Sequence, residues 1–300
     1  MAHPPEPKVY KNPEEAARIY LLPNLFTAGN MLCGFLAIKN CIEARFTDLN
    51  LPAAERAVAH ANHYLGAVWF ILLACVCDLF DGRVARATQR ESLFGAEFDS
   101  IADTVSFGVA PALMACFLII NPNQDKDIQL ATWLLAFVYL LCAGVRLARF
   151  NVLTNPLVPG NEKRAAGGDF VGLPSPAAAG MMASLVLALT KFIRFADTTN
   201  QPDQILQSWS RVLLPLMLVT SYLMVSNVRF PSLKKINWDT RARTRVFILI
   251  ILGGAGLFFF SEVAAPCIFL GYIIYGVIRH AFLLKKGETD PAPDDEEDVV

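Results

Sequence analysis

Apolar residues lie in long, nearly uninterrupted blocks along this chain, instead of recurring on one face of each predicted helix. A helix needs about 20 consecutive apolar residues to cross the hydrocarbon layer of a membrane, and most of the blocks approach that length. The pattern therefore predicts an all-α fold, a polytopic membrane helix bundle with about eight transmembrane helices. The predicted spans cover residues 21–42, 63–80, 94–120, 131–150, 176–195, 212–228, 246–260 and 263–284, and the second is expected to continue as a helix through Arg86.

Polar segments at both ends divide the chain into three parts. Residues 1–19 are expected to form an N-terminal segment, either an interfacial helix or a disordered tail. Residues 20–286 form the predicted integral membrane domain, and residues 287–300 form an acidic tail that we expect to be disordered. The longer polar loops are predicted at residues 43–62, 121–130 and 152–173.

Lysine and arginine are distributed unevenly between the predicted loops. Seventeen of them lie in loops on the side of the N-terminus, and five lie in loops on the opposite side. Cytoplasmic loops carry such an excess of positive residues, so both termini are predicted to face the cytoplasm, in a bacterial inner membrane. The net charge is −1, and nucleic acid is not an expected partner. All seven cysteines lie within or beside apolar blocks, which predicts buried free thiols instead of disulfides.

Four aspartates stand at the ends of two neighbouring apolar blocks. Asp78 and Asp81 follow one block, and Asp99 and Asp103 precede the next. Spacings of three and four residues place each pair on one face of a helix, and the short connection at residues 88–94 would let both pairs meet. Carboxylates beside a membrane span are unfavourable unless they bind a cation or take part in chemistry. Their hard oxygen atoms suit Mg²⁺, Mn²⁺ or Ca²⁺.

The spacing of these aspartates resembles the signature of the CDP-alcohol phosphotransferase family. From Asp78 to Asp103 the sequence reads D-x-x-D-G-x-x-A-R, eight residues, then G-x-x-x-D-x-x-x-D. Such enzymes have a six-helix catalytic core, cleave the diphosphate of a CDP-linked donor, transfer the phosphoryl-bearing moiety to an alcohol and release CMP. The resemblance implies two divalent ions, Mg²⁺ or Mn²⁺, with Asp103 as the general base and a further metal contact. The other implied metal ligands are Asp78, Asp81 and Asp99, and the implied CDP-donor contacts are Gly82, Ala85, Arg86 and Gly95.

Polar residues interrupt the first apolar block at helical spacing. Asn24, Thr27 and Asn30 recur every three residues and so share roughly one helix face. One interpretation is that they hydrogen-bond neighbouring helices, as polar groups in membrane bundles do. The other is that Asn24 and Thr27 line the pocket of the CDP donor. A similar P-N-x-x-T-x-x-N-x-x-x-G opening in phosphatidylserine synthases of this family favours the second interpretation.

Two arginines stand at the end of the fourth predicted helix, on the same membrane side as the aspartates. Arg146 and Arg149 could anchor the helix through the positive-inside bias. Alternatively, they could bind a substrate phosphate or carboxylate, because a guanidinium group matches both anions in shape. We favour anion binding, since Arg146 lies inside the apolar block.

Three further segments resemble the phosphatidylserine synthase subfamily. This resemblance implies transfer of the phosphatidyl group from CDP-diacylglycerol to L-serine, by a homodimer embedded among membrane lipids. The same chemistry with glycerol 3-phosphate or inositol phosphate as acceptor is one alternative. A divalent-cation transporter, in which the aspartates line the ion pathway, is another. The segments are RLARFN at residues 146–151, FVGLPSP at residues 170–176 and VSNVRFPSLK at residues 225–234.

Overall fold

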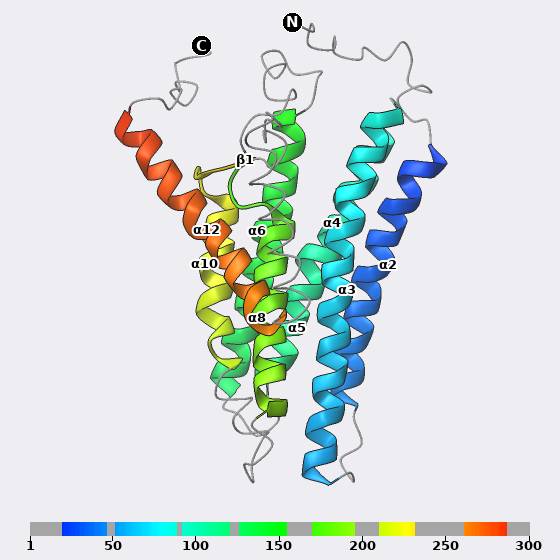
Figure 1. The fold of residues 1–300 in the computed structure, drawn as a ribbon, viewed down its shortest axis with the longest axis vertical. Helices are drawn as coiled ribbons and strands as arrows, with labels where there is room; N and C mark the ends of the chain where they lie inside the picture. Colours follow the sequence, from blue (N-terminus) through cyan, green and yellow to red (C-terminus); the bar gives the residue numbers. More distant parts are fainter. Residues whose placement is uncertain are drawn as a thin grey trace, which may run out of the picture.

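The structure, a computed structural model, describes residues 20–46, 52–88, 92–120, 126–154, 170–195, 210–231 and 261–286. Nearly all of these residues are helical, and the helices run along one long direction of the molecule (Figure 1). The helices are α2 (Leu21–Arg45), α3 (Ala53–Thr88), α4 (Leu93–Asp103), α5 (Ala110–Ile119), α6 (Lys126–Thr154), α8 (Ser175–Phe195), α10 (Leu213–Val225) and α12 (Ser261–Lys286). A π-helical segment, η1 (Thr104–Val109), joins α4 to α5.

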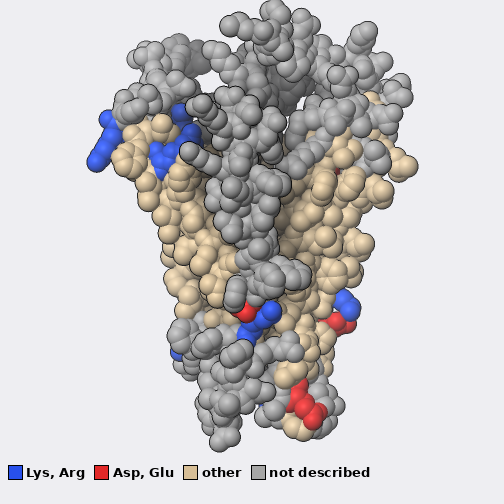
Figure 2. Space-filling model, viewed as in Figure 1, with Lys and Arg blue, Asp and Glu red and all other residues tan. Residues whose placement is uncertain are grey.

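The helices confirm the predicted membrane architecture in its main outline. Within the described residues, five segments are long and apolar enough to cross a membrane, and α10 is a shorter apolar helix. Among the coloured residues of Figure 2, uncharged side chains form a broad band between charged side chains at the upper left and others lower down. The predicted helix at residues 246–260, the N-terminal segment and the acidic tail all lie outside the described residues. The five segments are Asn24–Arg45, Val58–Gly82, Leu93–Ile119, Lys126–Leu153 and Glu262–Lys285.

Several predicted boundaries were wrong. The loop expected at residues 43–62 is much shorter, because α2 continues to Arg45 and α3 begins at Ala53. The first ten residues of α3 include five alanines, which have the highest helix propensity, so the helix extends beyond its apolar block. In the same way α6 begins at Lys126, inside the predicted loop at residues 121–130. In contrast, α10 ends at Val225, where the chain turns into an extended strand.

Helix α8 lies at the centre of the bundle. Its residues 178–184 are buried without interruption, and the helix packs against α3, α10 and α12. Neighbouring helices therefore surround this part of α8 on all sides. On the outer helices, large apolar side chains such as Leu32, Phe35 and Phe137 are exposed, as expected of a surface that faces lipid.

A two-stranded antiparallel ladder corrects the expectation of a purely α-helical chain. Strand β1 (Phe170–Val171) pairs with β2 (Arg229–Phe230), and Phe170 lies opposite Phe230. The ring of Phe230 is fully buried and packs on Tyr272 of α12, with a centroid distance of 5.8 Å. The ladder therefore ties the start of α8 and the end of α10 to α12 at one end of the bundle (Figure 1).

Candidate active site

Three aspartates meet between α3 and α4. Asp78, Asp99 and Asp103 each offer a carboxylate oxygen, and these atoms all lie within 4.8 Å of one another. The spacing of four residues places Asp99 and Asp103 on one face of α4, and the chain reverses within a few residues so that this face meets α3. Asp103 is buried, and the other two are partly buried. We call these three residues the aspartate cluster.

The aspartate cluster fits a divalent cation by its chemistry. Three carboxylates brought together repel one another unless a cation or protons neutralise them. One carboxylate oxygen of Asp99 is buried and has no hydrogen-bond partner among the described residues. Carboxylate oxygens are the ligands that Mg²⁺ and Mn²⁺ prefer. The residues present therefore match the donor set for such an ion.

Asp81, the fourth aspartate of the signature, lies next to the cluster. It is buried, and its carboxylate lies within hydrogen-bonding range of Asp99. The hydroxyl of Thr27 donates a hydrogen bond of 3.2 Å to Asp81 Oδ2, and the backbone N–H of Gly82 donates to the other oxygen. Asp81 is thus held by α2 and by its own helix, beside the aspartate cluster.

The polar face of α2 is directed at these acids. Besides the bond from Thr27 to Asp81, Asn30 Nδ2 donates a hydrogen bond of 3.0 Å to Asp103 Oδ1. The sequence allowed two interpretations of this face: hydrogen bonds to neighbouring helices, or the lining of a donor pocket. Thr27 and Asn30 do hydrogen-bond neighbouring helices, and the groups that accept these bonds are the aspartates of the site. Asn24 lies one turn earlier, beside Gly95 of α4, where a Cβ atom would approach the Asn24 side-chain oxygen to 3.4 Å. Ala85 and Arg86 belong to α3, but their side chains lie outside the described part of the chain.

The π-helical segment η1 directly follows Asp103, and sequence analysis missed it. Its fourth residue, Phe107, would accept a helical hydrogen bond from residue 111, but residue 111 is a proline and has no N–H. Instead, the N–H of Ala110 bonds to the carbonyl of Val105, five residues earlier. Pro111 was therefore the feature of the sequence that could have indicated the π-helical segment. Single π-helical turns occur frequently at functional sites.

The two arginines of α6 have different partners. Arg146 is 7% exposed, donates a hydrogen bond of 3.2 Å to Ser175 Oγ, and lies within electrostatic range of Asp103 and Asp78. Its guanidinium group also lies over the ring of Phe150, 5.2 Å from the centroid. Arg149 turns instead to the end of α10. It donates hydrogen bonds to the Val225 carbonyl and to Asn227 Oδ1.

The described parts of the three segments that resemble phosphatidylserine synthases, residues 146–151, 170–176 and 225–231, come together at this end of the bundle. The Phe150 ring packs on Phe170, which joins the end of α6 to β1. The N–H of Gly172 donates a hydrogen bond of 2.9 Å to the Val228 carbonyl, next to the ladder of β1 and β2. These contacts, together with the hydrogen bonds of Arg146 and Arg149, connect the ends of α6 and α10 to the segment before α8. We call this connected set of residues 146–151, 170–176 and 225–230 the motif junction. Arg146 links the motif junction to the aspartate cluster.

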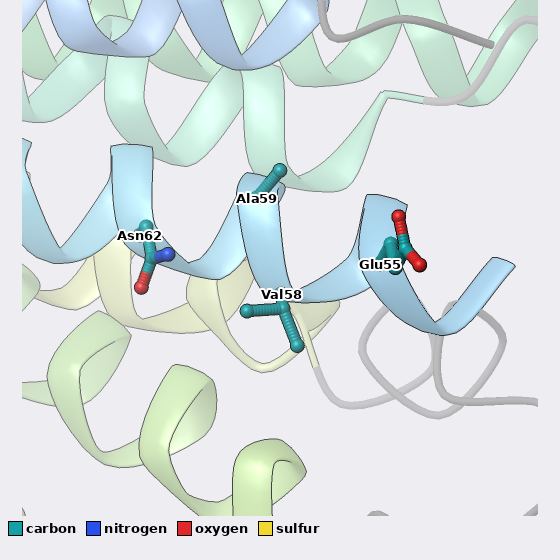
Figure 3. Close-up of a pocket in the computed structure, with 4 residues that line it drawn as sticks. All are labelled: Glu55, Val58, Ala59 and Asn62. Carbon is teal, nitrogen blue, oxygen red and sulfur yellow. The ribbon is translucent and has the colours of Figure 1, made fainter. Parts of the chain in front are cut away.

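A pocket elsewhere on the molecule has no such chemistry. Glu55, Val58, Ala59 and Asn62 line it, all on the first turns of α3 (Figure 3). Asn62 precedes Asp78 by 16 residues, which corresponds to roughly 24 Å along a helix. A single carboxylate among apolar and amide groups does not form a metal site, so the aspartate cluster remains the candidate active site.

Comparison with known proteins identifies the family of this chain. Residues 20–223 match the family model described as CDP-alcohol phosphatidyltransferase. A Helicobacter pylori protein named CDP-diacylglycerol–serine O-phosphatidyltransferase is 33% identical over 269 residues, which are 89% of this chain and 94% of the relative. A Bacillus subtilis protein of the same name is 30% identical over 215 residues, 71% of this chain and 92% of the relative. A Saccharomyces cerevisiae protein of that name is 35% identical over 190 residues, 62% of each chain.

Proposed function

This chain belongs to the CDP-alcohol phosphatidyltransferase family, and from this membership we propose that it transfers the phosphatidyl group of CDP-diacylglycerol to L-serine. The products are phosphatidylserine and CMP. The observation that carries the proposal is the aspartate cluster with Arg146 beside it, inside a bundle of apolar helices. A site of this kind, polar but embedded among lipid-facing helices, allows a lipid-linked donor and a water-soluble acceptor to meet.

Serine as the acceptor is supported by the relatives and by the motif junction. The relatives from Helicobacter pylori and Bacillus subtilis, whose names include serine, are matched over more than nine-tenths of their length. Arg146 is a buried cation whose guanidinium group can form a forked pair with a carboxylate. Serine has a carboxylate, whereas glycerol 3-phosphate and inositol phosphate have a phosphate group. A phosphate acceptor would call for more cationic groups around Arg146.

Asp78, Asp99 and Asp103 would hold Mg²⁺ or Mn²⁺. Asp81 would be a further ligand, because its carboxylate lies next to that of Asp99. Two ions fit four carboxylates by charge. When bound, such ions would neutralise the diphosphate of the donor and stabilise the charge that develops on the leaving CMP. On the chain itself, Thr27 and Asn30 keep Asp81 and Asp103 in place by hydrogen bonds.

The transfer itself needs one proton acceptor and accurate placement of the reactants. Asp103 takes the proton of the serine hydroxyl, whose oxygen attacks the phosphorus of the phosphatidyl group. The new phosphorus–oxygen bond forms as the bond to CMP breaks, in a direct displacement. Arg146 holds the serine carboxylate, and Arg149 supports it from the motif junction. The donor contacts are proposed for Asn24, Thr27, Gly82, Ala85, Arg86 and Gly95.

The surroundings of the site are part of the same proposal. The enzyme lies in a bacterial inner membrane, and its active site and both termini face the cytoplasm. Eight transmembrane helices are proposed, of which six form the catalytic core, and two copies of the chain associate as a homodimer. The relatives from bacteria and the apolar helices support the membrane location.

The proposal is tested by CMP release from purified protein with CDP-diacylglycerol and Mn²⁺ or Mg²⁺. Release should require L-serine and should disappear in the Asp103→Asn variant. Release that depends on glycerol 3-phosphate or inositol phosphate instead would keep the reaction and overturn the acceptor. Absence of release with every alcohol, together with Mn²⁺ flux into vesicles that contain the protein, would favour the cation transporter.

A further inference from the structure

Asp103 is the member of the aspartate cluster that reaches deepest into the helix bundle. It is 6% exposed, and its Oδ1 atom accepts a hydrogen bond of 3.0 Å from Asn30 Nδ2. Asn30 lies on α2, 73 positions earlier in the sequence, and is fully buried. The bond occupies one of the two carboxylate oxygens and leaves the other for a ligand or a proton.

Burial of Asn30 carries a cost to stability at one end of its amide. Its side-chain oxygen is buried and has no hydrogen-bond partner among the described residues. A buried acceptor without a donor destabilises the folded state, and an apolar side chain of similar size would avoid this penalty. This unpaired oxygen belongs to the same amide group whose nitrogen donates the hydrogen bond to Asp103. Such local conflicts with stability are expected at functional positions.

The backbone around Asn30 is tied to the segment that follows Asp103. Ser106 Oγ, in η1, donates a hydrogen bond of 2.8 Å to the Asn30 carbonyl. One turn further along α2, Gly34 lies so close to Ser106 that a Cβ atom would collide with it. This contact brings α2 against η1 and keeps the Asn30 amide within reach of Asp103.

We infer that Asn30 is a positioning residue, which orients the carboxylate of Asp103 for proton transfer and for its place in the aspartate cluster. The inference rests on the proposed function, in which Asp103 contacts the reacting hydroxyl. Asn30 itself touches neither substrate; it acts through Asp103. A residue in this role should affect the turnover number more than the binding of either substrate.

The test compares Asn30→Leu with Asn40→Leu in the full-length protein. Asn40 lies on the same helix, ten residues and about 15 Å further along, and its amide donates to the Leu36 carbonyl. Three quantities are measured for each variant: kcat and KM for CMP release, and the melting temperature with and without Mn²⁺. We expect Asn30→Leu to lower kcat at least tenfold, with both KM values within twofold of wild type. Its rise in melting temperature on adding Mn²⁺ should be at most half as large as that of wild type, because Asp103 is no longer oriented by the hydrogen bond from α2.

Asn40→Leu should keep kcat and the Mn²⁺-dependent rise within twofold of wild type. The inference is overturned if Asn30→Leu retains kcat within twofold, if it changes only KM, or if both variants lose kcat equally. If Asn30→Leu does not fold, Asn30→Ala, which cannot clash, is judged by the same criteria. Wild-type protein that releases no CMP with any alcohol would overturn the proposed function instead. In that case the Mn²⁺-dependent rise in melting temperature, measured for the same variants, still decides the role of Asn30.

Discussion

Arg149 donates a hydrogen bond of 2.7 Å to the Oδ1 atom of Asn227, a residue 78 positions further along the chain. Arg146, one helical turn earlier, donates instead to Ser175 and lies within electrostatic range of Asp103. The two arginines share a helix, but only Arg146 is directed at the aspartate cluster. Arg149 joins α6 to the end of α10 and thereby closes the motif junction.

Substitution of the two arginines should therefore have different effects. Arg146→Lys is expected to raise the KM for L-serine by about tenfold or more, because lysine cannot form the forked pair with a carboxylate. Arg149→Lys should leave this KM within twofold and lower the stability by roughly 1 kcal/mol, since its partners are protein groups and partly exposed. Initial rates at varied serine and melting curves measure both effects. An equal rise in KM for the two variants would show instead that both arginines bind the acceptor.

The aspartates should tolerate substitution less well than their hydrogen-bond partners. Asp99→Asn is expected to lower kcat by about a thousandfold or more, because the cluster loses one of its charged oxygen ligands. Thr27→Val removes one hydrogen bond to Asp81 and should lower kcat only fivefold to tenfold, the equivalent of roughly 1–1.5 kcal/mol. CMP release at saturating substrates gives the comparison. A Thr27→Val protein as inactive as Asp99→Asn would contradict this ranking and would make the Thr27 hydroxyl as necessary to the reaction as a metal ligand.

Metal removal should reverse the order of stability between wild type and an aspartate variant. With Mn²⁺ present, wild-type protein should melt at a higher temperature than Asp99→Asn, because an ion that binds the folded state stabilises it. With a chelator present, Asp99→Asn should be at least as stable as wild type, since it removes repulsion between carboxylates within 4.8 Å. Melting curves with EDTA and with Mn²⁺ measure this reversal. If both proteins respond to Mn²⁺ equally, the cluster does not hold the ion.

Gly172 has a backbone conformation that other residues adopt only with strain. Its φ angle is +81°, and a Cβ atom there would collide with the carbonyl oxygen of Met224. Gly172→Ala should therefore lower stability by more than about 1 kcal/mol and disturb the hydrogen bond to Val228. Gly144→Ala in α6 is the matched control, because its Cβ would meet no atom within 4 Å and alanine favours helices. Equal melting temperatures for the two variants would contradict the strain argument.

The proposed orientation can be tested without activity. A fluorescent protein fused after Val300 should fold and fluoresce, because it folds in the cytoplasm. Alkaline phosphatase fused at the same position should be inactive, because it becomes active only outside the cytoplasm. An active phosphatase fusion would place the C-terminus on the other side and would rule out an even number of spans with a cytoplasmic N-terminus.

The sequence alone predicted the helical membrane architecture and the residues of the aspartate cluster. Both are encoded locally: long apolar blocks predict spans, and spacings of three or four residues predict which side chains share a helix face. The short link between α3 and α4 allowed only a small range of arrangements, so the meeting of Asp78 with Asp99 and Asp103 could be expected. Boundaries were less predictable, because helices such as α3 continue beyond the apolar blocks on helix propensity alone.

Contacts between distant segments were decided only by the tertiary structure. The bonds from Thr27 to Asp81, from Asn30 to Asp103 and from Arg149 to Asn227 join residues 54 to 78 positions apart. Periodicity shows that Asn30 shares a face with Thr27, but it does not show which helix that face meets. That choice depends on how the small residues of α2 pack against η1 and on the burial of α8 among its neighbours. Such packing is a property of the whole bundle, because each helix face is buried only when all its neighbours are in place.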